Sequence, residues 1–305
     1  TYANSTFCAI SGYSQEELIG QNHSMLNSGF HPKGFFKEMW GVISSGQVWR
    51  AEICNRGKGG HLYWVDTTII PFKNDHGEIY KYLAIRNEIT ENKLLQIALN
   101  SLVELSSENP EIGYFSSISK TLCEVLDINA AVISSFDDQQ SHILACWNEQ
   151  GECSPSLLQN INQAMIQIPE EQEFFDLSYC PVLPKEKSNS LAHVLRDDQG
   201  KAIACLAILD TKTLRHQEAL KKILGLYGKR IEIELKRRVV LQELKESESR
   251  MKAVIDTAVD GIIICNQAGV IESLNPAAQS LFLIPPRKKA KNIQSLLPQI
   301  PIESL

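Results

Sequence analysis

The sequence predicts an α+β protein in which antiparallel sheets are flanked by helices. Two observations indicate this class. In residues 1–91, two short helical segments precede three strand-like segments that are rich in β-branched and aromatic residues. In residues 110–236, the pattern again runs from a helix through strands to a closing helix. The full length of 305 residues is enough for two or three domains.

In the first segment, the helices are expected at 15–20, ending at Gly20, and at 32–46, with Pro32 at its start and Gly46 at its end. Strands follow at 48–56, 61–72 and 79–89, separated by the turns GKGG and KNDHGE. Leucines at helical spacing predict a connector helix over 92–109, before Pro110 breaks the pattern.

In the second segment, a helix over 112–128 precedes strand signals at 130–138 and 141–149. Two further strands, over 189–197 and 201–210, are joined by the hairpin signal DDQG. His193 superficially resembles a kinase phospho-acceptor, but its alternating strand pattern favours a structural role.

A charged helix is expected over 216–258. When a heptad repeat is laid on this helix, seven of the ten residues at positions a and d are apolar, which indicates a parallel coiled coil. Residues 237–252 are expected to be the coiled-coil linker helix between the second and third domains. The ten positions are Leu226, Arg230, Ile233, Arg237, Val240, Leu244, Ser247, Met251, Val254 and Ala258. A single amphipathic surface helix is the alternative interpretation.

The bulk composition excludes several classes of partner. Hydrophobic residues make up 43% and charged residues 22%, as in ordinary globular proteins. A net charge of -6 provides no basic surface for nucleic acid, so no nucleic-acid partner is expected. No apolar run approaches the ~18 residues of a membrane span. We expect a cytoplasmic fragment of a longer chain, which a membrane segment elsewhere could tether.

The eight cysteines form no C-x-x-C pair, so no metal site is expected. Several lie in apolar strand-like runs, which favours buried, reduced thiols.

An internal repeat links the two ends of the chain. The start, TYANSTFCAISGY, and the later stretch ESLNPAAQSLFLI each place an Asn, then small residues, then a Phe. We therefore expect residues 253–305 to be the first part of a second copy of the N-terminal domain.

The stretches YANSTFCAISGYSQEELIG and YLAIRNEITENK resemble a PAS domain, and NEIT resembles the signature by which such domains lead into a signalling helix. The first strand of that family is missing here. Residues 247–305 are similar to the first half of another PAS domain. Residues 110–238 resemble a GAF domain, for which no ligand signature is evident.

The segment GQNHSML, Gly20–Leu26, indicates which group of PAS domains the first domain resembles. Light-sensing LOV domains carry G-R-N-C-R-F-L there, so His23 stands in place of the cysteine that forms the covalent flavin adduct. The remaining motif resembles the redox-sensing flavin PAS domains of aerotaxis receptors and nitrogen-fixation regulators. That resemblance implies FAD, held without a covalent bond.

An isoalloxazine ring needs apolar walls and amide groups that both donate and accept hydrogen bonds. The walls are assigned to three tryptophans and two aliphatic residues, and Asn55 to the polar edge of the ring. Arg86 stands where LOV domains have a Gln, and its side chain can only donate hydrogen bonds. Three positions are open for it: facing the ring, binding the phosphate of FAD, or pointing to solvent. The candidate cofactor-binding residues are Asn22, His23, Met25, Leu26, Trp40, Trp49, Asn55, Arg56, Trp64 and Arg86.

The sequence thus predicts the sensory region of a bacterial-type signalling protein, which reports redox state or oxygen and acts as a homodimer on an output domain outside this chain. No catalytic residue is expected within it. The alternative is a cofactor-free dimerisation and interaction module of a histidine kinase or a cyclic-di-GMP enzyme.

Overall fold

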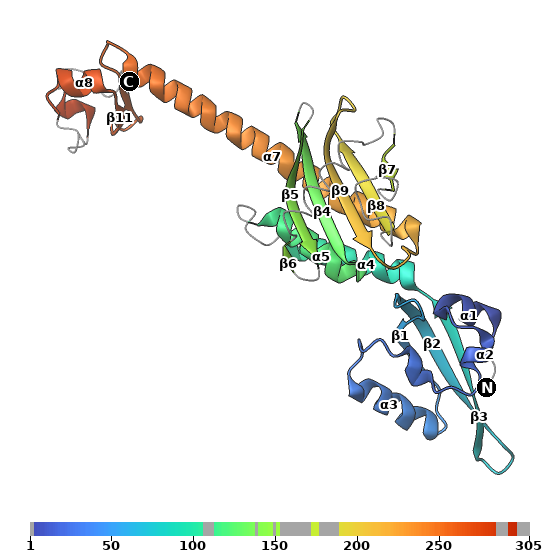
Figure 1. Ribbon diagram of the computed structural model, residues 1–305. Coiled ribbons are helices and arrows are strands. Elements are labelled where there is room, and N and C mark those ends of the chain that lie inside the picture. Colours follow the sequence, from blue (N-terminus) through green and yellow to red (C-terminus); the bar gives the residue numbers. More distant parts are fainter. Residues whose placement is uncertain are drawn as a thin grey trace. The chain divides into compact units, whose positions relative to one another are not determined.

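The computed structural model describes residues 3–105, 113–137, 140–148, 151–152, 172–176, 189–284 and 292–297 (Figure 1). The chain divides into two compact units, Thr1–Glu232 and Ile233–Leu305. Among the described residues, no helix is long and apolar enough to cross a membrane.

The N-terminal part of the first unit consists of short helices followed by a sheet. The helical elements are α1 (Ser5–Ser11), α2 (Gln15–Leu18), η1 (His23–Leu26) and α3 (Lys33–Ser44). The strands are β1 (Trp49–Arg56), β2 (Leu62–Lys73) and β3 (Ile79–Glu88), paired antiparallel in the order β1-β2-β3. The helices and strands expected here are confirmed.

Local sequence explains where these helices begin and end. Asn4 caps α1 by accepting a hydrogen bond from the Phe7 amide at 2.9 Å. Ser14 and Glu17 form a reciprocal capping box at the start of α2. Pro32 precedes α3, and Gly46 follows it with a φ of 83°, a conformation that favours glycine.

The middle of the chain forms a larger sheet. Its strands are β4 (Ala130–Asp137), β5 (Gln140–Asn148), β6 (Gly151–Glu152), β7 (Phe174–Phe175), β8 (Asn189–Arg196) and β9 (Ala202–Asp210). They pair antiparallel in the order β6-β5-β4-β9-β8-β7. The predicted hairpin joins β8 to β9, and His193 lies buried within β8 as expected.

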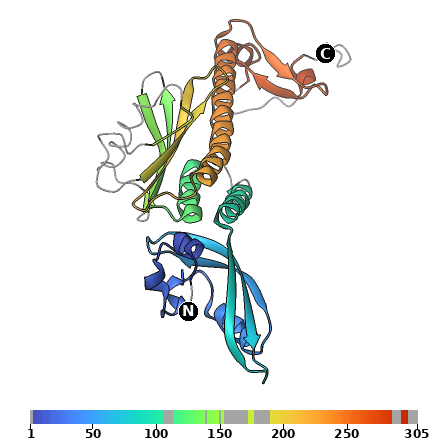
Figure 2. The same ribbon diagram turned by 90° about the vertical axis from the view of Figure 1, so that its right-hand side faces the viewer.

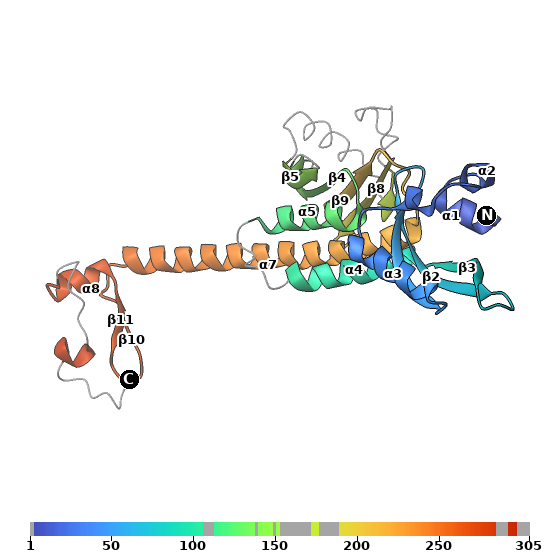
Figure 3. The same cartoon turned by 90° about the horizontal axis from the view of Figure 1, so that it is seen from below.

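Three helices lie on one face of this sheet: α4 (Thr90–Leu105), α5 (Tyr114–Leu126) and the first part of α7 (Gln217–Thr257) (Figures 2 and 3). The Tyr227 hydroxyl of α7 lies 2.6 Å from the Ser101 hydroxyl of α4. Arg230 donates to the Tyr114 hydroxyl of α5 at 2.8 Å. The connector helix and the closing helix are therefore packed parts of this unit.

The expectation that the cysteines are reduced is wrong for Cys146, which is disulfide-bonded. It holds for Cys54 and Cys205, which are buried thiols. Sequence spacing could not decide this, because a disulfide depends on which Cα atoms the fold brings within about 7 Å of each other.

The second unit, after the C-terminal part of α7, contains β10 (Ile263–Cys265), β11 (Ile271–Leu274), α8 (Pro276–Leu281) and η3 (Ile293–Ser295). The strands form an antiparallel pair. Asn275 caps α8 by accepting from the Ala278 amide at 2.8 Å, as Asn4 caps α1. The internal repeat expected from sequence is therefore present as a shared asparagine cap.

Candidate functional site

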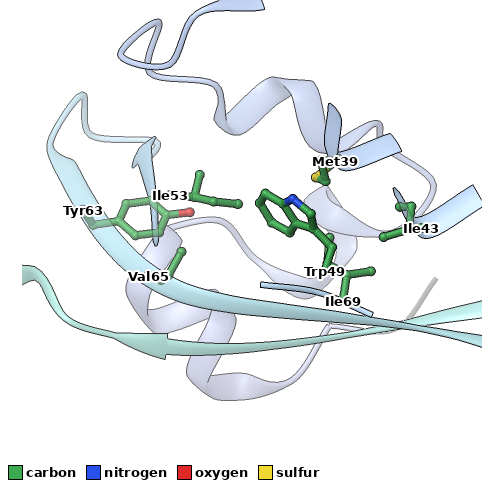
Figure 4. Packing of buried hydrophobic residues seen from close by; sticks show 7 residues of the cluster. All are labelled: Met39, Ile43, Trp49, Ile53, Tyr63, Val65 and Ile69. Carbon is green, nitrogen blue, oxygen red and sulfur yellow. The ribbon is translucent and has the colours of Figure 1, made fainter. Parts of the chain in front are cut away.

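One face of the first sheet, here called the inner face, carries the candidate site. The cross-strand pairs Trp49↔Ile69, Ile53↔Val65 and Asn55↔Tyr63 place these side chains on the same side of β1 and β2. The pair Thr67↔Arg86 extends the face to β3. Figure 4 shows Trp49, Ile53, Tyr63 and Val65 along the sheet, with Met39 and Ile43 of α3 beside them.

The walls of the inner face are apolar. Trp49, Ile53 and Val65 are buried, and Leu26 of η1 is only 1% exposed. Met25, next to it, is half-buried. This apolar surface is of the kind that a flat aromatic ligand requires.

Three polar atoms on the inner face are buried and have no hydrogen-bond partner. They are the Tyr63 hydroxyl, the Thr67 hydroxyl and Nε of Arg86. The Asn55 amide approaches the Tyr63 hydroxyl without forming a hydrogen bond of normal geometry. Because a buried unpaired polar group is costly, three of them on one face indicate a place for a polar ligand edge.

Burial also controls protonation here. It raises the pKa of Tyr63 to about 12, so the phenol stays neutral and able to donate. Burial lowers the pKa of Arg86. Burial and the positive charge of Arg86 lower the pKa of His23, which favours the neutral imidazole.

The inner face is covered in this structure. The Arg86 guanidinium lies 4.8 Å from the centre of the Phe7 ring of α1, and that ring lies 6.4 Å from the ring of His23. Tyr63, Val65 and Thr67 are fully buried beneath the cover. Phe7 of α1 and His23 of η1 therefore lie over the part of the inner face that carries Arg86.

Five of the predicted residues lie at this face or its cover: His23, Met25, Leu26, Trp49 and Asn55. Arg86 lies on the inner face as well, opposite Thr67, and its role toward a cofactor stays a prediction. Asn55 is 7% exposed.

Trp40 and Trp64 do not join Trp49 in one wall. Trp40 is 57% exposed at the far end of α3, with its ring 6.2 Å from that of Tyr82. Trp64 lies between Tyr63 and Val65 in β2, so strand alternation turns it to the opposite face.

Asn22 and Arg56 also have other roles in this structure. Asn22 is exposed and caps η1 by accepting from the Ser24 amide. Arg56 donates to the Gly60 carbonyl at 2.7 Å and lies 3.5 Å from the Asp127 carboxylate.

The opposite face of the sheet, here called the outer face, connects to α4. The Trp64 amide donates to the Thr90 hydroxyl at 3.0 Å, and the Ile89 amide donates to the Trp64 carbonyl at 2.9 Å. Lys93 of α4 lies 5.3 Å from the Trp64 ring centre and pairs with Glu52 of β1. The strand that carries Tyr63 and Thr67 is thus bonded directly to the first turn of α4.

Sequence reasoning missed Phe7, Tyr63 and Thr67 as members of the site. The signal that could have found the last two is the period-two alternation of β2, in which Tyr63, Val65, Thr67 and Ile69 share one face. The prediction named Trp64, the neighbouring position, whose side chain lies on the opposite face.

The fold and the match to family models agree on the class of these domains. Residues 1–91 and residues 249–303 each match a model of the PAS domain. The expected PAS domain at each of these places is confirmed.

Part of this chain is similar to two bacterial proteins. It is 37% identical over 105 residues to the nitrogen fixation regulatory protein of Klebsiella pneumoniae, covering 34% of this chain and 21% of that protein. It is 36% identical over 97 residues to the aerotaxis receptor of Escherichia coli K12, covering 32% and 19%. The chain therefore spans about a fifth of the length of these relatives.

A solved PAS domain from Colwellia psychrerythraea is 28% identical, with a TM-score of 0.25 over 28% of this chain and 71% of that chain.

Proposed function

We propose that the first PAS domain is a redox sensor that holds FAD without a covalent bond on its inner face. The observation that carries the proposal is the group of three unpaired buried polar atoms, on Tyr63, Thr67 and Arg86, within an apolar surface. The similarity to a nitrogen fixation regulatory protein and an aerotaxis receptor supports a sensory role.

In this proposal each group of residues has its own task. Trp49, Ile53 and Leu26 contact the faces of the ring and exclude water. The Asn55 amide and the Tyr63 and Thr67 hydroxyls bind its polar edge. The flavin supplies a group that changes charge and hydrogen bonding on reduction.

The relay follows the bonds from the sheet to the helix. A shift of β2 at Tyr63 or Thr67 moves the backbone of Trp64, which is bonded to Thr90 at the start of α4. We propose that α4 passes this strain to a GAF-like domain over 110–236, and that α7 conveys it, in a homodimer, to a cytoplasmic output domain outside this chain. A bias of a few kcal/mol between two states is sufficient.

The experiment uses two neighbouring threonines as a matched pair. Thr67 faces the site, and Thr68 lies on the outer face of the same strand. Purified chain should retain flavin, seen as visible absorption that disappears on reduction. Thr67→Val should weaken flavin binding about tenfold, the effect of about 1.4 kcal/mol from one lost hydrogen bond, and Thr68→Val should not.

The same measurement identifies the cofactor, because chromatography of the released flavin separates FAD from FMN. Wild-type chain that folds but binds no flavin, even when flavin is supplied in excess, would contradict the proposal.

A second candidate is a cofactor-free interaction module. It is favoured by β3, which is the last strand of its sheet and carries exposed Tyr80, Tyr82, Leu83 and Ile85. A colourless protein whose self-association is lost on Leu83→Lys would support this candidate instead.

A further inference from the structure

We propose that Arg86 sets the reduction potential of the ring bound on the inner face, by stabilising its reduced, negatively charged form. This inference rests on the flavin function proposed above and adds a specific role for one residue.

Arg86 is a cation without a counter-ion. Its Nε is buried without a partner, and among the residues that the structure describes it forms no ion pair. Other arginines of the domain are paired, for example Arg50 with Asp66 and Arg56 with Asp127. A buried unpaired charge is unfavourable, so the site favours a ligand that carries negative charge.

The Phe7 ring compensates only part of this cost. The guanidinium lies 4.8 Å from the ring centre, within the range of a cation–π contact. Such a contact leaves the Nε–H donor without an acceptor, because a ring face accepts hydrogen bonds poorly. That donor therefore remains for a ligand atom that accepts.

Arg86 brings a positive charge to this site, whereas its neighbours Tyr63 and His23 are held in their neutral forms. The nearby Tyr63 is neutral, with a pKa of about 12, and the pKa of His23 is lowered by burial and by Arg86 itself. Burial lowers the pKa of Arg86 as well, but an arginine stays protonated at neutral pH.

The charge that the ring gains on reduction decides whether Arg86 raises or lowers the reduction potential. Two-electron reduction with uptake of one proton adds one negative charge to the ring. A fixed cation binds that form more tightly than the neutral oxidised form, and this raises the reduction potential.

The test measures the midpoint potential of the flavin-loaded chain by spectroelectrochemical titration. Arg86→Gln should lower it by at least about 30 mV, which corresponds to a tenfold change in the affinity ratio of the two forms in a two-electron couple. Arg86→Lys keeps the charge and should lower it by less. The matched control is Arg50→Gln, on the exposed outer face of β1.

If Arg86→Gln binds flavin too weakly for the titration, the dissociation constants of oxidised and of reduced flavin are measured separately. Through the thermodynamic cycle, the ratio of these two constants gives the same potential difference. If the potential of Arg86→Gln is equal to or above that of wild type, the role of Arg86 is overturned and the flavin function is left intact. Wild-type chain without flavin overturns both.

Discussion

At the scale of single residues, His31 links the loop before α3 to the edge of β1. Its ring Nε2 accepts a hydrogen bond from the Cys54 amide at 2.8 Å, so the ring must be neutral. Its pKa is lowered by burial. A lowered folded-state pKa means that this stabilisation is present above about pH 6.5 and is lost as the pH falls through the folded-state value.

We therefore expect the first domain to lose stability on going from pH 7.5 to pH 5, and His31→Gln to reduce this loss. Protonation breaks a bond of about 1 kcal/mol, whereas a glutamine oxygen accepts at both pH values. Urea unfolding at the two pH values measures the difference. His76→Gln, in an exposed turn, is the control, and an unchanged pH dependence in His31→Gln would contradict the assignment.

At the scale of elements, the joint between β2 and α4 depends on one hydroxyl. Thr90 is 2% exposed, accepts from the Trp64 amide, and lies 3.0 Å from the Glu88 carboxylate. Thr90→Val should lower the free energy of unfolding by about 1–3 kcal/mol, because a buried amide loses its acceptor. Thr90→Ser keeps the hydroxyl and should cost less. Chemical denaturation distinguishes the two, and a loss in Thr90→Ser as large as that in Thr90→Val would mean that packing of the methyl group contributes as much as the hydroxyl.

At the scale of the whole molecule, α7 leaves apolar side chains without cover. Ile233, Val240, Leu244, Met251 and Val254 of the heptad grid are all more than half exposed. Such a stripe is buried when two helices pair in parallel. A second copy of the chain is the partner that we propose.

We expect the chain to sediment as a dimer, and Leu244→Asp to weaken dimerisation at least tenfold, or by about 1.4 kcal/mol. Gln242→Asp adds the same charge off the stripe and should change little. Sedimentation equilibrium over a range of concentrations measures both variants. A monomeric wild-type chain would favour the single surface helix considered as the alternative.

The sequence by itself determined the order and type of the elements, because caps, turns and hydrophobic period are local signals. Asn4, Ser14 and Gly46 mark helix ends within a few residues of themselves. Only the tertiary structure decided which residues face one another. Tyr63 and Trp64 are neighbours with similar side chains, but Tyr63 packs with the residues of α1 and α3, whereas the Trp64 ring lies beside Lys93 of α4. That choice depends on segments far away in the chain, as does the placement of an unpaired Arg86 against Phe7.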